Sequence, residues 1–193
     1  MGRGNGAESP AHCFTAEDIA AILREHGWVD RAVAAEKGPA SEDAVYKDSA
    51  MEAWLVDAAA LLGPHAADVS ELASLVALIF EYDARAILAS LESHTVLARE
   101  GARQVIRELA HLVLDGPEID SDRFKEIVTT LKTKLRYSGR ELFHPIRLAL
   151  AGRAGEGELD RVILLLDPAT RLPFRGPVKG TRQRMLEFCA ALD

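Results

Sequence analysis

Cysteine, long apolar runs and targeting signals are all scarce in this sequence of 193 residues. The two cysteines, Cys13 and Cys189, have no C-x-x-C spacing, which predicts a reduced, cytoplasmic protein without a disulfide framework. The start lacks the charged and apolar regions of a secretory signal. The patch from Val162 to Leu166 is far shorter than the roughly 20 apolar residues of a membrane span, so we expect no membrane insertion.

Aromatic residues are also few, at 6%, although 48% of the sequence is hydrophobic and rich in alanine and leucine. This composition suits helices packed on helices better than a sheet of aromatic and β-branched strands. No segment alternates apolar and polar residues with a period of two. The sequence therefore predicts an all-α fold.

Motifs for cofactors, metals and nucleophilic catalysis are missing. No P-loop occurs, and the G-R-G-N-G run near the start lacks the preceding strand of a dinucleotide site. The histidines show no tight ligand spacing, the nearest cluster being His12 and Cys13 with His26. We expect no metal, no cofactor and no catalytic residue.

Charge is unevenly divided along the chain, whose net charge is −7. The acidic residues concentrate before residue 121, and lysine and arginine concentrate after it. The division predicts an acidic helical subdomain at 14–120 and a basic one at 121–193. Residues 1–13 are Gly-rich and aperiodic, which predicts a flexible tail. A basic C-terminal part suits an anionic partner, although surface charge also drifts along chains for no functional reason.

Helix signals recur along the acidic part. Thr15 and Asp18 form a capping box, and a helix through Trp54 should stop at Gly63-Pro64. The spacing of apolar residues then predicts three more helices. The first begins near Asp68, the second runs from Asp83 to Glu92 and the third from Val96 to Leu114. A loop is expected at Lys37 to Ser41.

The basic part begins with an amphipathic helix over residues 122–136, capped by Asp120 and carrying Lys132, Lys134 and Arg136 near its end. Most such charged faces are merely solvated. Pro145 fits the first turn of a short helix that ends at Gly152, with Ile146, Ala149 and Leu150 inside and Arg147 turned to another side.

The remaining helices are shorter. One should run from Leu159 to Leu166 and stop at Asp167-Pro168, and a last one passes through Met185. The stretch G-R-E-L-F-H-P-I-R-L-A-L-A-G-R, residues 139–153, contains the short helix around Pro145 and carries three arginines. Its arginines and its helix start together predict a segment that can lie next to an anion.

Within that stretch, P-I-R-L-A-L-A-G resembles the P-L-R-x-A-L-T-G signature of the C-terminal region of bacterial-type glutamyl-tRNA synthetases. The Gly139-Arg140 pair and the H-A-A-D-V-S-E-L run of residues 65–72, followed by E-Y-D-A-R-A, are similar to further elements of that family in the same order. The likeness covers roughly residues 50–166 and, more loosely, 14–192. It implies two consecutive helical subdomains that bind a tRNA anticodon arm.

The resemblance concerns the anticodon-binding region alone. The family's H-I-G-H-like and K-M-S-K-S-like catalytic loops have no counterpart here, so we expect no aminoacylation by this chain. It implies either a free-standing paralogue or the C-terminal piece of a synthetase, acting beside a separate synthetase or another protein.

Positions that match the family's anticodon-facing residues are the candidate site. His144, Arg147, Glu156 and Leu159 match by motif, and arginine forks and unpaired loop bases suit each other chemically. His65 stands where the family has an arginine that helps read the third anticodon base, which weakens the expectation of glutamate-type discrimination. With the nearby cations, the candidate RNA-binding residues are Arg140, His144, Arg147, Arg153, Glu156, Leu159, Lys132, Lys134, Arg136 and His65.

Purely structural roles stay open for the same residues. Arg147 could be a surface or capping residue, and His144 a simple N-cap before proline. At the level of the protein, the alternative is a helical protein-interaction or regulatory module that kept the fold and lost the RNA surface.

Overall fold

The computed structural model describes residues 14–29 and 42–192, with side chains from residue 49 onward in the second range. No strand occurs among these residues, which confirms the all-α prediction. The predicted tail at 1–13 and the predicted loop at Lys37 to Ser41 lie outside the described residues. The helices are α1 (Ala16–Glu25), α2 (Glu42–Leu62), the 3₁₀ helix η2 (Gly63–His65), α3 (Val69–Phe80), α4 (Ala84–Leu88), α5 (Leu91–Leu97), α6 (Ala102–Leu114), α7 (Ser121–Leu135), α8 (Arg140–Ala151), α9 (Glu158–Ala169) and α10 (Thr181–Leu192).

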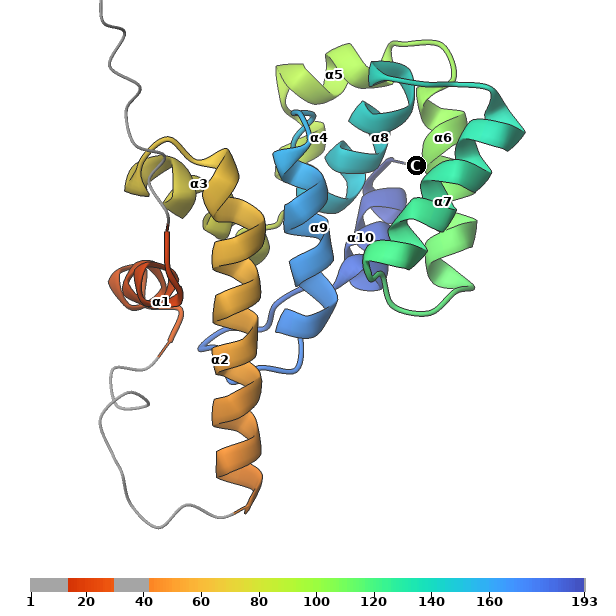
Figure 1. The fold of residues 1–193 in the computed structure, drawn as a ribbon. Helices are drawn as coiled ribbons and strands as arrows, with labels where there is room; N and C mark the ends of the chain where they lie inside the picture. Colours follow the sequence, from red (N-terminus) through yellow and green to blue (C-terminus); the bar gives the residue numbers. More distant parts are fainter. Residues whose placement is uncertain (1–13, 30–41, 193) are drawn as a thin grey trace, which may run out of the picture.

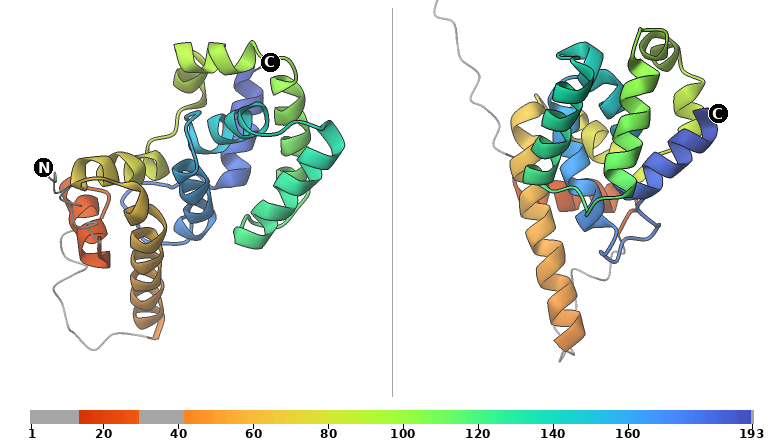
Figure 2. Two further views of the ribbon diagram at one scale, coloured as in Figure 1. Left: turned by 45° about the horizontal axis from the view of Figure 1, so that its top comes forward. Right: turned by 90° about the vertical axis from the view of Figure 1, so that its right-hand side faces the viewer.

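Helix α9 lies in the middle of the fold (Figure 1). It packs against α2 and α3 on one side and against α8 on the other. On the side of α8, helix α6 contacts α7, α8 and α10 (Figure 2). The subdomain boundary predicted at residue 120 falls between α6 and α7, which pack on each other, and the division stays a prediction.

Local signals placed several helices well. The capping box of Thr15 and Asp18 is present at the start of α1, with both reciprocal hydrogen bonds. Asp68 caps α3, as predicted, and the buried face of this helix consists of Leu72, Leu75, Val76 and Ile79. These elements are confirmed because their start and their buried face are both encoded within a few neighbouring residues.

The helices predicted from Asp83 to Glu92 and from Val96 to Leu114 are wrong in their boundaries. The chain forms three shorter helices instead, α4, α5 and α6. The hydroxyl of Ser90 accepts a hydrogen bond from the Ser93 N–H and starts α5. Gly101 adopts φ +81°, a left-handed conformation that ends any continuous helix and precedes α6.

Both proline positions were also misjudged. Helix α8 begins at Arg140 rather than near Pro145, and Pro168 lies inside α9 rather than beyond its end. A proline within a helix removes one N–H donor and crowds the carbonyl four residues earlier, a cost that packing can offset. Pro145 is buried, whereas Pro168 is exposed at the end of α9. Helix α9 is held by other contacts, such as the Trp54 indole N–H, which donates to the Leu165 carbonyl at 3.2 Å.

Every residue of α8 from Pro145 to Ala151 is buried. The expectation that Arg147 turns away from the buried face is therefore wrong, since α8 is covered on all sides by α5, α6, α9 and α10. Leucine and alanine meet this requirement without polar groups. The one charged residue in that run needs partners inside the protein.

The last helix is fixed by a buried arginine. Arg184 of α10 is fully buried, and its guanidinium donates to the backbone carbonyls of Lys179, Leu150, Leu78 and Ile79 at 2.7–2.9 Å. The guanidinium also lies 4.5 Å from the centre of the Tyr82 ring. This arginine joins α10 to the ends of α3 and α8.

Gly101→Ala is expected to destabilise the protein by about 2 kcal/mol or more, because left-handed backbone costs a non-glycine residue about 1–2 kcal/mol. A Cβ there would also overlap the Tyr137 ring. Gly157→Ala is the matched control, since Gly157 has φ −65° and a Cβ would meet nothing within 4 Å. Urea unfolding of both variants gives the comparison. Equal stability of the two variants would contradict the prediction.

No helix in the described part of the chain is long and apolar enough to cross a bilayer.

Candidate functional site

The turn between α8 and α9, residues 152–157, is held by the guanidinium of Arg147. Its Nε and Nη2 donate to the two carboxylate oxygens of Asp160 at 2.7 and 2.8 Å. Its Nη1 donates to the Gly155 carbonyl at 2.7 Å, and the Phe143 ring lies 4.9 Å below the group. One arginine of α8 thereby fixes both the first turn of α9 and the loop that leads into it.

Arg147 is only 7% exposed. Its three guanidinium nitrogens are all engaged inside the protein, so it shapes this surface rather than presenting a free cation to it. A bidentate arginine–carboxylate pair is geometrically specific and costly to break when buried. Direct contact of Arg147 with RNA stays an untested prediction, and the contacts favour a positioning role.

Arg140 and Arg153 are the exposed cations beside this turn. Arg140 is 3.5 Å from the Glu156 carboxylate, with side chains that are 75% and 69% exposed. An ion pair of this kind contributes little stability, and an RNA phosphate can replace Glu156 at low cost. Arg153 has no side-chain hydrogen bond or ion pair within the described residues.

His144 lies one helical turn after Arg140 and contacts Arg99, which the sequence analysis missed. The Arg99 guanidinium is 3.1 Å from His144 Nδ1, so this nitrogen accepts and the proton resides on Nε2. His144 Nε2 is buried and has no partner within the described residues. Burial and then the Arg99 charge lower the pKa of His144, so the ring is neutral at pH 7. No local pattern links residues 99 and 144, which explains the omission.

A shallow depression lies in front of His144. Its volume is about 400 Å³, and it is lined by Leu91, Glu92, Thr95, Val96, Arg99, His144 and Ala154. An apolar surface with a neutral histidine and an arginine at its edge is chemically suited to a planar unpaired base.

The other predicted residues lie in three different situations. Leu159 is 2% exposed and belongs to the core, so it supports the turn from beneath. His65 is exposed in η2. Because α2 and α9 run in opposite directions, η2 and the α8–α9 turn lie at the same end of the fold (Figure 1).

Lys132, Lys134 and Arg136 form a separate group at the end of α7. Lys134 pairs with Glu108 of α6, whereas Lys132 and Arg136 are exposed without a side-chain partner among the described residues. Arg136 caps α7 with φ 61°. These cations are linked to α8 by the segment 136–139 rather than by direct contact with the turn.

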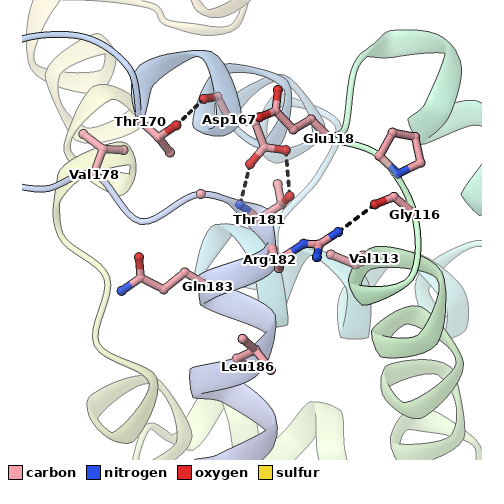
Figure 3. Close-up of a pocket in the computed structure, with 12 residues that line it drawn as sticks. Val113, Gly116, Glu118, Asp167, Thr170, Val178, Thr181, Arg182, Gln183 and Leu186 are labelled. Atoms are coloured by element: carbon pink, nitrogen blue, oxygen red, sulfur yellow. Dashed lines mark hydrogen bonds between the residues drawn. The ribbon is translucent and has the colours of Figure 1, made fainter.

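A larger cavity of about 610 Å³, shown in Figure 3, contains none of the predicted site residues. Asp167 at its edge accepts hydrogen bonds from the backbone N–H groups of Ile119 and Thr181 and from the Thr181 hydroxyl. The carboxylate joins the start of α10 to the segment before α7, which is a structural role. Within the described residues, no group of three potential ligands could hold a metal ion.

Known proteins are similar to this chain over part of its length. The profile of the family described as "Anticodon binding domain" matches residues 15–170. Glutamate–tRNA ligase of Carboxydothermus hydrogenoformans is 33% identical over 78 residues, which are 40% of this chain and 16% of the ligase. Glutamate–tRNA ligase 2 of Syntrophus aciditrophicus is 28% identical over 113 residues, 58% of this chain and 23% of the ligase. The glutamate–tRNA ligase of Bacillus licheniformis is 30% identical over 103 residues, 53% of this chain and 21% of the ligase.

These matches span between 16% and 23% of the length of the three ligases. No solved structure matches the chain at a comparable level of significance.

Proposed function

The chain belongs to the anticodon-binding domain family, and we propose on this basis that it binds the anticodon arm of a tRNA without catalysing aminoacylation itself. The observation that carries the proposal is the α8–α9 turn, fixed by Arg147 and Asp160 and flanked by the exposed Arg140 and Arg153. Arginine forks of this kind bind phosphates and the edges of unpaired bases. His144, which contacts Arg99, lies at the edge of the shallow depression.

The non-catalytic part rests on how little of the ligases is matched. At most 23% of a relative's length aligns, so the ligases' chemistry is not assigned to this chain. A separate synthetase or another protein would then act together with it. Glutamate-dependent charging of tRNA by the isolated chain would overturn this part of the proposal.

The double variant Arg140→Gln/Arg153→Gln is expected to bind an anticodon-arm hairpin about tenfold more weakly at 0.1 M salt, because two phosphate contacts are lost. Each lost contact to single-stranded RNA should make the slope of log K against log salt shallower by about 0.7. Fluorescence anisotropy with a labelled hairpin measures both quantities. Both arginines are exposed, so the melting temperature should stay unchanged.

Arg24→Gln/Arg171→Gln is the matched control. It removes the same charge from α1 and from the segment that follows α9, where Arg171 pairs with Glu118. If the parent protein binds no hairpin even at low salt, the RNA proposal fails. The alternative of a helical protein-interaction module would then replace it.

A further inference from the structure

Two residues of opposite charge, Arg99 and Glu92, line the shallow depression in front of His144. They form no ion pair with each other, and Glu92 has no side-chain partner within the described residues. Nη1 of Arg99 is 3.1 Å from His144 Nδ1, whereas its Nε and Nη2 have no hydrogen bond in the part of the chain that the structure describes. The depression therefore offers both hydrogen-bond donors and hydrogen-bond acceptors to a ligand.

Helix α5 and the residues just after it place these groups on one side. The five lining residues of this segment follow the helical repeat of three and four: Leu91, Glu92, Thr95, Val96 and Arg99. Seven residues, about two helical turns, separate Glu92 from Arg99, so a ligand that lies between them can bind both. Helix α5 packs on α8, and Ala154 of the α8–α9 turn lines the same depression, which is therefore continuous with the candidate site.

Leu91 supplies an apolar surface to the depression. Its side chain is 81% exposed, more than any other exposed large apolar side chain of the described residues. Val96 and Ala154 add further apolar atoms to the lining. Unpaired RNA bases are planar and pack on such surfaces while their edges form hydrogen bonds.

The free fork of Arg99 favours two of the four bases. A guanidinium binds best to two adjacent acceptor atoms, which guanine presents as O6 and N7. Cytosine presents the adjacent pair O2 and N3, whereas every acceptor of uracil is flanked by a donor and adenine has no adjacent pair on either free edge. A carboxylate such as that of Glu92 accepts a hydrogen bond from the amino group of cytosine or guanine.

We propose that this depression binds one unpaired cytosine or guanine of the RNA, with Arg99 on its two adjacent acceptors, Glu92 on its amino group and Leu91 against its ring. This inference rests on the proposed function, and it adds the class of base and the residues that distinguish it. The depression supplies preference between bases, and the exposed arginines beside the turn supply affinity for phosphate.

Four hairpins with one stem and different seven-nucleotide loops measure the preference. One loop contains only cytidine and is compared with a loop of uridine. Another alternates guanosine with adenosine and is compared with a loop of adenosine. Each comparison keeps the ring size and the charge and changes the base edge. The parent should bind the first loop of at least one comparison about tenfold more tightly, as expected for a bidentate contact, and that comparison identifies the base.

Arg99→Lys separates recognition of a base from contact with a phosphate. Lysine keeps the charge but lacks the planar fork, so the preference should fall below about twofold while the salt dependence stays unchanged. Glu92→Ala should also reduce the preference and weaken binding of the preferred loop, although it removes a negative charge that repels RNA. Leu91→Ala should weaken binding of all four hairpins about threefold without lowering the melting temperature, because the side chain is exposed.

Arg103→Gln is the matched control. Arg103 is exposed, lies four residues after Arg99 and does not line the depression, so the preference should be the same as in the parent. If the parent binds the hairpins without preference in either comparison, or if the preference persists in Arg99→Lys, this inference is overturned and the proposed function stands. If the parent binds none of the hairpins, both are wrong.

Discussion

Replacing Arg184 with methionine is expected to lower the melting temperature by roughly 10 °C. The side chain is fully buried, and four backbone carbonyls, those of Leu78, Ile79, Leu150 and Lys179, accept hydrogen bonds from it. Each buried acceptor that loses its partner costs about 1–3 kcal/mol, so a total of about 3–4 kcal/mol is a conservative figure. In a chain of this length, 1 kcal/mol shifts the melting temperature by about 2–4 °C.

The charge of Arg184 is stabilised by carbonyl dipoles and by the face of Tyr82 rather than by a carboxylate in direct contact. Burial lowers the pKa of Arg184 to about 10, with Tyr82 and two more distant carboxylates opposing the shift. The group is still protonated at neutral pH. Arg184→Lys keeps a cation but lacks the planar fork, so it should lose nearly as much stability as methionine.

Arg182→Gln is the matched control for this experiment. Arg182 is an exposed arginine of the same helix, and its one side-chain hydrogen bond goes to the Gly116 carbonyl at 2.8 Å. Its replacement should change the melting temperature by about 2 °C or less. Differential scanning calorimetry measures all three variants. A methionine variant that melts within 2 °C of the parent would show that the four carbonyl contacts contribute nothing net.

The sequence predicted the elements whose signals are local. Thr15, Asp68 and Asp120 each cap the helix that follows them, because a side-chain oxygen and the N–H groups it bonds lie within three residues. The breaks at Ser90 and Gly101 were missed although both residues carry a signal. Apolar residues on both sides of each break keep a helical spacing, so the periodicity predicts a continuous helix across the serine and across the glycine.

The motif predicted which elements carry two of the candidate residues but not the contacts that these residues make. The motif located Arg147 and Glu156 correctly on α8 and the following turn. It gave no sign that Arg147 would be buried against Asp160, since the packing of α5, α6 and α10 around α8 depends on contacts between distant segments. The same reason hid the contact between Arg99 and His144. Pairs of this kind arise from tertiary structure, which composition and periodicity do not encode.

Asp160→Asn is expected to weaken hairpin binding about as much as Arg147→Ala, roughly tenfold, although Asp160 itself repels RNA. The two residues form one pair, with side chains 8% and 19% exposed, that holds the α8–α9 turn in place. Loss of either partner leaves a largely buried charge uncompensated and costs about 3 kcal/mol of stability. Arg140, Arg153 and His144 would then no longer share a fixed geometry.

This result separates a positioning role of Arg147 from direct contact with RNA. If Arg147 bound a phosphate directly, Asp160→Asn would release its guanidinium, and affinity would stay the same or rise. Arg147→Lys sharpens the distinction, because lysine keeps the charge but cannot bridge Asp160 and the Gly155 carbonyl as the guanidinium does. A positioning role predicts weak binding by the lysine variant, and a phosphate contact predicts near-normal binding.

Glu141→Gln controls for charge alone. Glu141 is exposed on α8 with no side-chain partner within the described residues, so its loss removes the same negative charge without touching the turn. Affinity should stay level or rise slightly, in the direction opposite to that of Asp160→Asn. Binding is measured well below the melting temperature of each variant, with circular dichroism to verify the helices. If Asp160→Asn and Arg147→Lys both bind as well as the parent, Arg147 contacts RNA directly. The proposal that the Arg147–Asp160 pair positions the turn for binding would then be wrong.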